Sequence, residues 1–326
     1  MKTIAWTVGA DNPVIRPGQL HPGLDDQHAG AGHVLDLGDR FRIYYWGAGQ
    51  AGNVILMAES PVDRPNDWKP LGGVLLAPQP ETSHNCWGPS FPFVVPLDDR
   101  RWLMVFAAWG AIRQEGKLAN TTNLAISEDA GLTWRYHDKN PILPLDRPWD
   151  HEGTGSVSMV RAGDRWRMYY TAISDYYASP AGVQTAQGSR IARMGIALAE
   201  SHDGFQWVKH NSGLVLAPRA FDADPYEYIN SKPFVLREPD GWRMWFSSVG
   251  PAYRIQEAWS EDGVTWRHQC PKADDYLGIG MPGAFDDHQR SYAVVVKRAN
   301  DYHLWYTGNG FGKTGMGYAR GSTRGS

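Results

Sequence analysis

An internal repeat constrains the fold of this chain more than any other feature. Five runs of alternating apolar and polar residues, each rich in aromatic side chains, recur along the 326 residues. They are RFRIYYWG (40–47), RWLMVFAAW (101–109), RWRMYYTA (165–172), GWRMWFSS (241–248) and YHLWYTG (302–308). Alternation with a period of two predicts half-buried strands. We therefore expect one strand-rich unit to be used several times along the chain.

A second repeated element is a tight turn that ends in a tryptophan. The turns SPVDRPNDW, SEDAGLTW, SHDGFQW and SEDGVTW end at Trp68, Trp134, Trp207 and Trp266. Asp and Gly are typical of such turns, and the tryptophan begins the next strand. The last run has no such turn after it, but the segment around Trp6 has the matching features, because Asn12-Pro13 follows Trp6 as Asn140-Pro141 follows Trp134. The N-terminal strand is expected to complete the last unit and close a ring, which removes an exposed sheet edge.

These patterns predict an all-β fold, a single five-bladed β-propeller of four-stranded antiparallel blades. The composition agrees, since 15 Trp and 15 Tyr favour strands and 36 Gly and 22 Pro favour turns. We expect one domain over residues 1–321 and a flexible C-terminal tail over 322–326. The inner strands of the blades are expected to begin near Ala29, Ser90, Gly155, Ser231 and Ser291.

The charge pattern excludes several classes of partner. With 32 basic and 35 acidic side chains the net charge is −3, which gives no bulk attraction to nucleic acid or to an anionic membrane. The sequence holds no apolar run of membrane-spanning length and no signal peptide at its start. Cys86 and Cys270 fit a reducing compartment. We expect a soluble cytoplasmic protein with no nucleic-acid or membrane partner, and the sequence leaves its oligomeric state open.

Polar segments precede each predicted inner strand, and in a propeller these segments meet on one face. They carry the candidate catalytic acids Asp26, Asp150, Glu152, Glu227 and Asp287. Crowded carboxylates shift one another's pKa values, so that one group can donate a proton while another stays ionised. Cleavage of a glycosidic bond needs such a pair.

Some of these acids follow from the repeat and some do not. An Asp after an aromatic residue or Leu recurs at Asp25, Asp150, Asp222 and Asp286, and a residue repeated in several blades is more typical of a turn or a strand cap than of a catalyst. Asp26, Glu152 and Glu227 do not follow from the repeat and therefore carry more information.

The same segments hold candidate binding residues. Four tryptophans remain once blade packing is accounted for, and their flat rings are suited to stacking on a sugar: Trp46, Trp87, Trp109 and Trp149. Polar candidates are His28, His84, His151, Asn230, Lys232 and Arg290. His288 adds a fourth histidine, and this set of imidazoles raises the alternative of a metal site, although the ligand spacing is not local.

On these features the chain resembles the five-bladed propeller glycoside hydrolases, the superfamily of families 32, 43, 68, 117 and 130. Trp87-Gly88-Pro89 is similar to the Trp-Ala-Pro that opens the second inner strand in family 43. Asp287-His288 lies where that family has a Gly-His whose imidazole faces a central metal, often calcium. The resemblance implies His288 as a metal contact and a structural Ca²⁺ or another divalent metal in the central tunnel, with no cofactor required for the chemistry.

The resemblance also implies roles for the acids. By blade, the family's Asp base corresponds to Asp26, its second Asp to Asp150 with Glu152 as competitor, and its Glu general acid to Glu227. The family's acids begin the inner strands, whereas here they lie a few residues upstream. We expect a hydrolase of a small glycoside or oligosaccharide that inverts the anomeric centre.

Two alternatives stay open at this point. A histidine, metal or phosphate site, with Arg290 and Lys232, would instead support a phosphorylase, a lyase or a tailoring reaction on a small metabolite. A sugar-binding propeller without catalysis would use the aromatic faces alone.

Overall fold

The computed structural model describes residues 3–50, 52–80, 84–113, 117–178, 190–219, 227–250, 252–270 and 276–323. The strands are, in chain order, β1 (Ile4–Val8), β2 (His28–Asp36), β3 (Arg40–Gly49), β4 (Gly52–Pro61), β5 (Lys69–Pro70), β6 (Gly88–Pro96), β7 (Trp102–Arg113), β8 (Lys117–Ser127), β9 (Arg135–Tyr136), β10 (Gly153–Ala162), β11 (Arg165–Ala178), β12 (Arg190–Ser201), β13 (Val208–Leu216), β14 (Ile229–Glu238), β15 (Gly241–Val249), β16 (Tyr253–Ser260), β17 (Arg267–His268), β18 (Ser291–Arg298), β19 (Asp301–Thr307) and β20 (Met316–Thr323). One helical turn, α1 (Asn309–Gly312), precedes β20.

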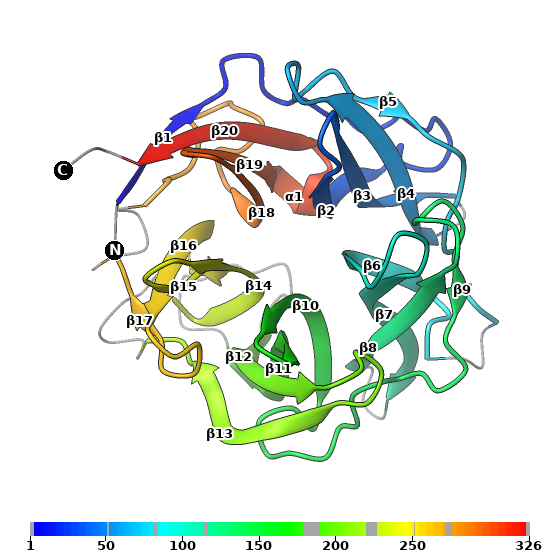
Figure 1. Cartoon of the computed structure of the whole chain (residues 1–326), viewed down its shortest axis with the longest axis vertical. Coiled ribbons are helices and arrows are strands. Elements are labelled where there is room, and N and C mark those ends of the chain that lie inside the picture. The colour runs from blue at the N-terminus through cyan, green and yellow to red at the C-terminus, as the bar shows by residue number, and fades with distance from the viewer. Residues whose placement is uncertain are drawn as a thin grey trace.

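The strands form antiparallel sheets arranged around a ring, so the protein is an all-β propeller (Figure 1). Three sheets have four strands each, in the orders β2-β3-β4-β5, β14-β15-β16-β17 and β1-β20-β19-β18. The fourth sheet has eight strands and consists of β6 to β9 and β10 to β13, joined through a single parallel pair between Asn120 of β8 and Gly153 of β10. Each half of it repeats the strand order of the smaller sheets. We call each set of four strands a unit, numbered 1 to 5 from the unit that begins with β2.

The N-terminal strand completes the last unit, as the sequence predicts. β1 pairs antiparallel with β20, with Ile4 opposite Thr323. Asn12 holds this join, because its side chain bonds both the N–H and the C=O of Tyr318. Asn140 makes the same pair of bonds to Leu124 in unit 2, which explains the repeated Asn-Pro. β20 runs to Thr323, two residues into the segment expected as a tail.

The tryptophan turns are structural links between units. In unit 4 the Asp262 carboxylate accepts the N–H groups of Val264 and Thr265 at 2.7 and 2.8 Å. The hydrogen bond from Thr265, followed by the others, lowers the pKa of Asp262 to about 2. The carbonyl of Gly263 accepts the Tyr169 hydroxyl of unit 3 at 2.8 Å. This turn therefore braces its own strands and the neighbouring unit.

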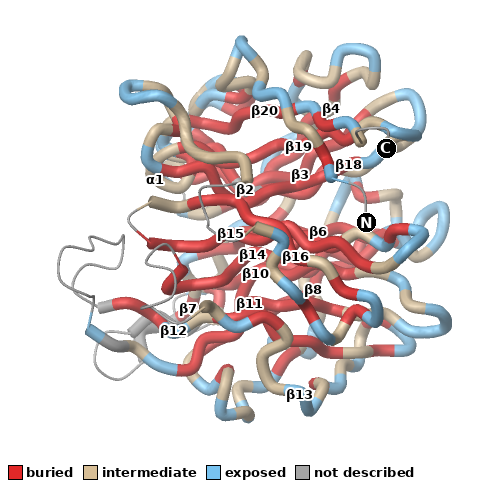
Figure 2. Tube along the Cα trace, turned by 90° about the vertical axis from the view of Figure 1, so that its left-hand side faces the viewer, coloured by how far each residue is buried: buried red, intermediate tan, exposed pale blue. Residues whose placement is uncertain are grey.

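Aromatic side chains close the centre of the ring. His33 of β2 stacks on Phe93 of β6, with centroids 4.0 Å apart, and both lie within 6 Å of Phe234 of β14. These three residues come from units 1, 2 and 4, so they meet across the axis of the ring. We call them the plug. Figure 2 shows the buried strands between two more exposed faces, with α1 on one side and both termini on the other. No helix in the described part of the chain is long and apolar enough to cross a membrane.

Candidate active site

Strand register places the predicted site residues on one face of the ring. The first residue of each inner strand pairs with the last part of the second strand, as His28 with Ala48, Gly88 with Trp109 and Ser291 with Thr307. The segments that enter the inner strands therefore share a face with the connections between second and third strands. We call this the site face, and it is the face that carries α1 in Figure 2.

The repeated aspartates are buried beneath the site face. Asp25, Asp150 and Asp286 are at most 2% exposed, and each accepts a hydrogen bond from a tyrosine of its own second strand at 2.7 to 2.8 Å. Those tyrosines are Tyr45, Tyr170 and Tyr306. Burial raises the pKa of Asp25, which has no cation within hydrogen-bonding distance among the described residues. This position is a scaffold position in three units.

Asp150, an expected catalytic acid, is one of these scaffold residues. Besides the bond from Tyr170, its carboxylate forms a buried ion pair with Lys209 at 2.6 Å. The carboxylate is 0% exposed, so substrate cannot contact it in this conformation. In this conformation Asp150 anchors its loop against the second and fourth strands, and a direct role on substrate stays a prediction.

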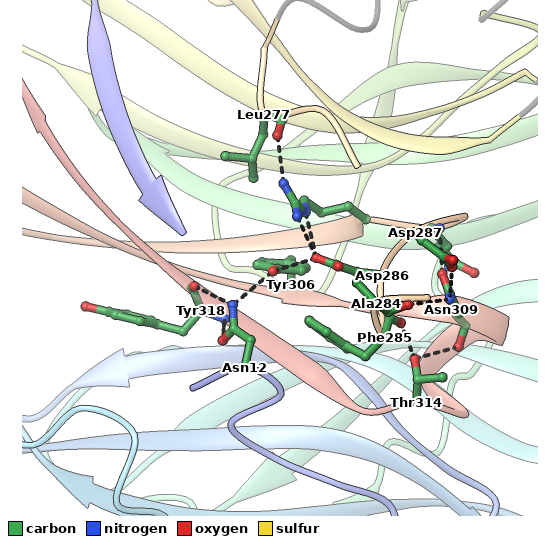
Figure 3. A network of polar contacts seen from close by, with 12 residues as sticks. Asn12, Leu277, Ala284, Phe285, Asp286, Asp287, Tyr306, Asn309, Thr314 and Tyr318 are labelled. Carbon is green, nitrogen blue, oxygen red and sulfur yellow. Dashed lines mark hydrogen bonds and ion pairs between the residues drawn. The ribbon is translucent and has the colours of Figure 1, made fainter. Parts of the chain in front are cut away.

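Arg290 was expected to bind substrate, but the structure buries it with Asp286. Its guanidinium donates to Asp286 Oδ2 through Nε and Nη2 at 2.9 and 2.7 Å, and to the carbonyl of Leu277 at 2.7 Å. Figure 3 shows this network, in which Tyr306 joins Asp286 to Asn12 of the ring closure. Arg290 therefore stabilises the last unit.

Glu227, the expected general acid, is also 0% exposed. It forms ion pairs with Arg219 and with His268, the latter at 2.6 Å, and it accepts a bond from Asn230 at 2.8 Å. Burial alone would raise the pKa of Glu227, but the bond and charge of His268, together with Asn230 and Arg219, outweigh it and lower the pKa. A buried carboxylate held ionised is a poor proton donor, so Glu227 and the expected binding residue Asn230 belong to the scaffold of unit 4.

Three expected acids keep solvent contact. Asp26 is exposed and accepts the Gly23 N–H at 2.9 Å. The Glu152 side chain is 21% exposed and lies 4.0 Å from His151 Nε2. Asp287 is 14% exposed and accepts the Gly283 N–H and the Asn309 amide, each at 2.7 Å. These two bonds, that of Gly283 first, lower the pKa of Asp287, so it is suited to a fixed negative charge.

Aromatic side chains run from the rim of the site face into the ring. His28 stacks on Trp46, with centroids 5.4 Å apart and an interplanar angle of 14°. Trp46 contacts Phe91, and Phe91 contacts Tyr292 edge-on at 5.0 Å. Burial, followed by the charge of Lys313, lowers the pKa of His28, whose buried Nδ1 has no hydrogen-bond partner.

The other expected binding residues differ in exposure. Trp87 is 51% exposed and Trp109 donates its indole N–H to Ser90. Trp149 is partly buried and donates its indole N–H to Tyr170 at 3.3 Å, which ties it to the scaffold. His84 bonds the Asn123 side chain at 2.6 Å, and His151 is exposed.

Four residues occupy equivalent positions in the inner strands of units 2 to 5: Phe91, Ser156, Lys232 and Tyr292. We call them the throat. Each lies in the bulge of its inner strand, and three have positive φ angles of 47° to 59°. A bulge turns a side chain away from the regular alternation. Only Lys232 was expected as a site residue. The signal that would have found Phe91 and Tyr292 is the residue after Ser in Ser90-Phe91, Ser231-Lys232 and Ser291-Tyr292, whereas Ser156 follows Gly155.

The described residues do not fit the metal implied by the resemblance. His288 is 86% exposed and has a single acidic neighbour, Asp287, at 3.7 Å. No three His, Cys, Asp or Glu side chains converge anywhere in the described ranges. At the centre of the ring, burial and then the charge of Lys232 lower the pKa of His33, and two such basic groups do not attract a cation.

Comparison with solved structures supports the fold. A glycoside hydrolase matches with a TM-score of 0.68 at 17% identity, covering 92% of this chain and 90% of the other. A family 43 glycoside hydrolase, described as thermostable, matches with a TM-score of 0.65 at 17% identity, covering 94% and 91%. A third match, with a TM-score of 0.70 at 12% identity over 97% and 93%, comes from work on family 130, described as mannoside phosphorylases that include glycoside hydrolases of β-1,2-mannosidic linkages in Candida mannan. At these identities the likeness concerns the fold, which confirms the resemblance at that level.

Sequence comparison identifies nearer relatives. No family model matches the chain. The uncharacterized protein Rv1502 of Mycobacterium tuberculosis strain H37Rv is 30% identical over 294 residues, which cover 86% of this chain and 88% of the relative. The uncharacterized protein MT1551 of strain CDC 1551 matches over the same length with the same identity. The chain therefore belongs to the protein family of Rv1502, a family with the propeller fold of glycoside hydrolases.

Proposed function

We propose that this protein is a five-bladed propeller enzyme that hydrolyses a small glycoside or oligosaccharide at its site face. The five units would be the five blades, with the eight-stranded sheet counted as two. Glu152 would protonate the leaving oxygen, and Asp26 would activate the attacking water, with inversion of the anomeric centre.

The observation that carries this proposal is the separation of the acids by burial. Asp150 and Glu227 are withdrawn into ion pairs, whereas Asp26 and Glu152 stay accessible in the segments that enter β2 and β10. A general acid must reach the leaving group, and a base must reach a water on the opposite side of the sugar. Two accessible carboxylates on one face meet that requirement.

Asp287 and the aromatic residues would position the sugar. The lowered pKa of Asp287 keeps it ionised near neutral pH, so it can accept hydrogen bonds from hydroxyl groups without exchanging a proton. The exposed ring of Trp87 and the stacked pair of His28 and Trp46 offer flat surfaces to a pyranose ring.

The proposal also supplies a geometric requirement. In an inverting enzyme the acid and base carboxyls lie roughly 6.5 to 9.5 Å apart, to leave room for water, and in a retaining enzyme about 5 to 5.5 Å. If a ligand-bound structure shows the Asp26 and Glu152 carboxyls near 5 Å apart, the enzyme is expected to retain the anomeric configuration rather than invert it.

The test is a screen of aryl glycosides and natural oligosaccharides, with the first-formed anomer followed by NMR. For a substrate found in this way, Asp26→Asn and Glu152→Gln are each expected to lower kcat about 10²- to 10⁴-fold. Asp164→Asn is the control, because Asp164 is 82% exposed in the turn between β10 and β11 on the opposite face. Wild-type turnover in both acid variants would refute the assignment. Ligand binding by all variants without any turnover would favour a sugar-binding module.

A further inference from the structure

Lys232 in the throat is a buried ionisable group whose charged end has no partner in the described part of the chain. It is 1% exposed, and its Nζ has no hydrogen-bond partner. The equivalent bulges of units 2, 3 and 5 carry the uncharged residues Phe91, Ser156 and Tyr292. The repeat therefore does not require a cation at this position. Burial lowers the pKa of Lys232 to about 7.

Two other buried cations among the described residues have acidic partners. Lys209 has Asp146 and Asp150 within 2.9 Å, and Arg290 donates two hydrogen bonds to Asp286. An ammonium group without a counter-ion costs several kcal/mol to bury, or else loses its proton. Lys232 thus differs from Lys209 and Arg290, because no described residue gives it an acceptor.

The ammonium group of Lys232 has no acceptor within hydrogen-bonding distance among the described residues. His33, in the plug below, accepts the Val94 N–H through Nδ1 at 3.1 Å, so its Nε2 carries the hydrogen. Burial, and then the charge of Lys232, lowers the pKa of His33 to about 3, which places the two groups within electrostatic reach. A ligand that complements this part of the ring must bring an acceptor with negative charge.

The backbone holds Lys232 at this position. Its N–H donates to Thr171 Oγ1 at 3.0 Å, and the same hydroxyl bonds Ser156 at 2.9 Å. The inner strand is bulged here, with φ of 47° at Lys232. Phe91 and Tyr292 also have positive φ angles, so the bulge belongs to the repeat and the lysine side chain is what is particular to unit 4.

We propose that the throat is an oxyanion subsite, in which Lys232 pairs with the carboxylate of an acidic sugar or with a phosphate group. The inference deepens the proposed function, since it adds an anionic group to the ligand. Because Lys232 is buried, neighbouring side chains must rearrange when the anion enters.

The test uses the full-length protein and two probes, inorganic phosphate and D-glucuronate, with D-glucose and chloride as uncharged and simple-anion controls. Binding is measured by calorimetry and by the shift in Tm. Lys232→Met is expected to weaken anion binding about tenfold or more, because a charge-assisted hydrogen bond is lost. Lys69→Met is the matched control, since Lys69 is 73% exposed on the outer strand β5.

Each outcome decides the proposal. Binding of phosphate alone identifies a phosphate group, binding of glucuronate alone identifies an acidic sugar, and binding of both supports a general oxyanion subsite, provided that Lys232→Met weakens it and Lys69→Met does not. No binding of either anion at millimolar concentration, or equal binding by Lys232→Met, overturns the proposal. If Asp26→Asn and Glu152→Gln keep anion binding while the wild type hydrolyses no glycoside, the hydrolase proposal fails and the subsite stands.

Discussion

Asp150 and Glu152 lie two residues apart in one segment, yet the fold gives them opposite surroundings. Asp150 is fully buried against Tyr170 and Lys209, whereas Glu152 keeps 21% of its side chain exposed on the site face. Asp25 and Asp26 show the same contrast in the first unit. In both segments the acid that follows the repeat is buried and its non-repeated neighbour is accessible.

The contrast indicates that, within one loop, the repeated acid has a structural role and its non-repeated neighbour is the candidate for catalysis. The repeated aspartate is buried in the three units where the structure describes it, because the same turn is anchored each time. Lys232 extends the rule, since it interrupts a series of uncharged throat residues. Function in this protein is therefore expected where the repeat is broken.

The largest expected effect comes from removing a repeated acid. Asp286→Ala leaves Arg290 buried without its counter-ion and Tyr306 without an acceptor, and is expected to lower the free energy of unfolding by about 3 to 5 kcal/mol. Urea denaturation measures the change. The neighbouring Asp287→Ala is the control, and an equal loss in both variants would break the contrast between repeated and non-repeated acids.

Replacing Lys232 is expected to raise the free energy of unfolding. The folded-state pKa of about 7 lies below the usual value of 10.5, so between these two pH values the unfolded chain binds more protons and wild-type stability rises with pH. Lys232→Met is expected to add up to about 4 kcal/mol at pH 7, a gain that shrinks toward pH 10. Denaturation midpoints across this pH range test it, and a gain independent of pH would show that the amine is not the cause.

A smaller effect is expected at the tyrosine that holds Asp150. Tyr170→Phe removes one hydrogen bond to a buried carboxylate and should cost about 1 to 3 kcal/mol. Phe106 and Phe246 occupy the equivalent positions in units 2 and 4, so the ring itself fits. A double-mutant cycle with Asp150→Asn measures the coupling, and a coupling of zero would contradict the pairing.

The smallest effect on stability is expected at Trp87. Because its ring is 51% exposed, Trp87→Ala should change the free energy of unfolding by no more than about 0.5 kcal/mol. The same change should raise KM for a sugar substrate several-fold while kcat changes little, since stacking binds ground state and transition state alike. Val208→Ala, at a residue 73% exposed on β13, is the control and should leave KM unchanged.

The ring could be predicted from the sequence because every unit repeats its pattern. Period-two runs place the second strands, and the match of Asn12 to Asn140 predicts the closure that β1 and β20 make. Inner strands begin within about two residues of the expected positions. A pattern that recurs in several copies averages out the ambiguity of any single segment.

The site was harder to predict because burial depends on partners far away in the chain. Glu227 looked like a free loop acid, but His268, 41 residues later, and Arg219 enclose it. Arg290 likewise finds Asp286 and Leu277 rather than solvent. Sequence can place an acid on the correct face, whereas only the packing decides whether its carboxylate points outward or into an ion pair.

The most direct test of the account is a comparison of kcat/KM for Glu152→Gln and Glu227→Gln, measured on folded protein below each variant's Tm. The account predicts that Glu152→Gln loses about 10²- to 10⁴-fold in kcat/KM, whereas Glu227→Gln loses stability and keeps its turnover per folded molecule. Full turnover in Glu152→Gln together with a dead but folded Glu227→Gln would contradict it, because catalysis would then belong to the buried acid.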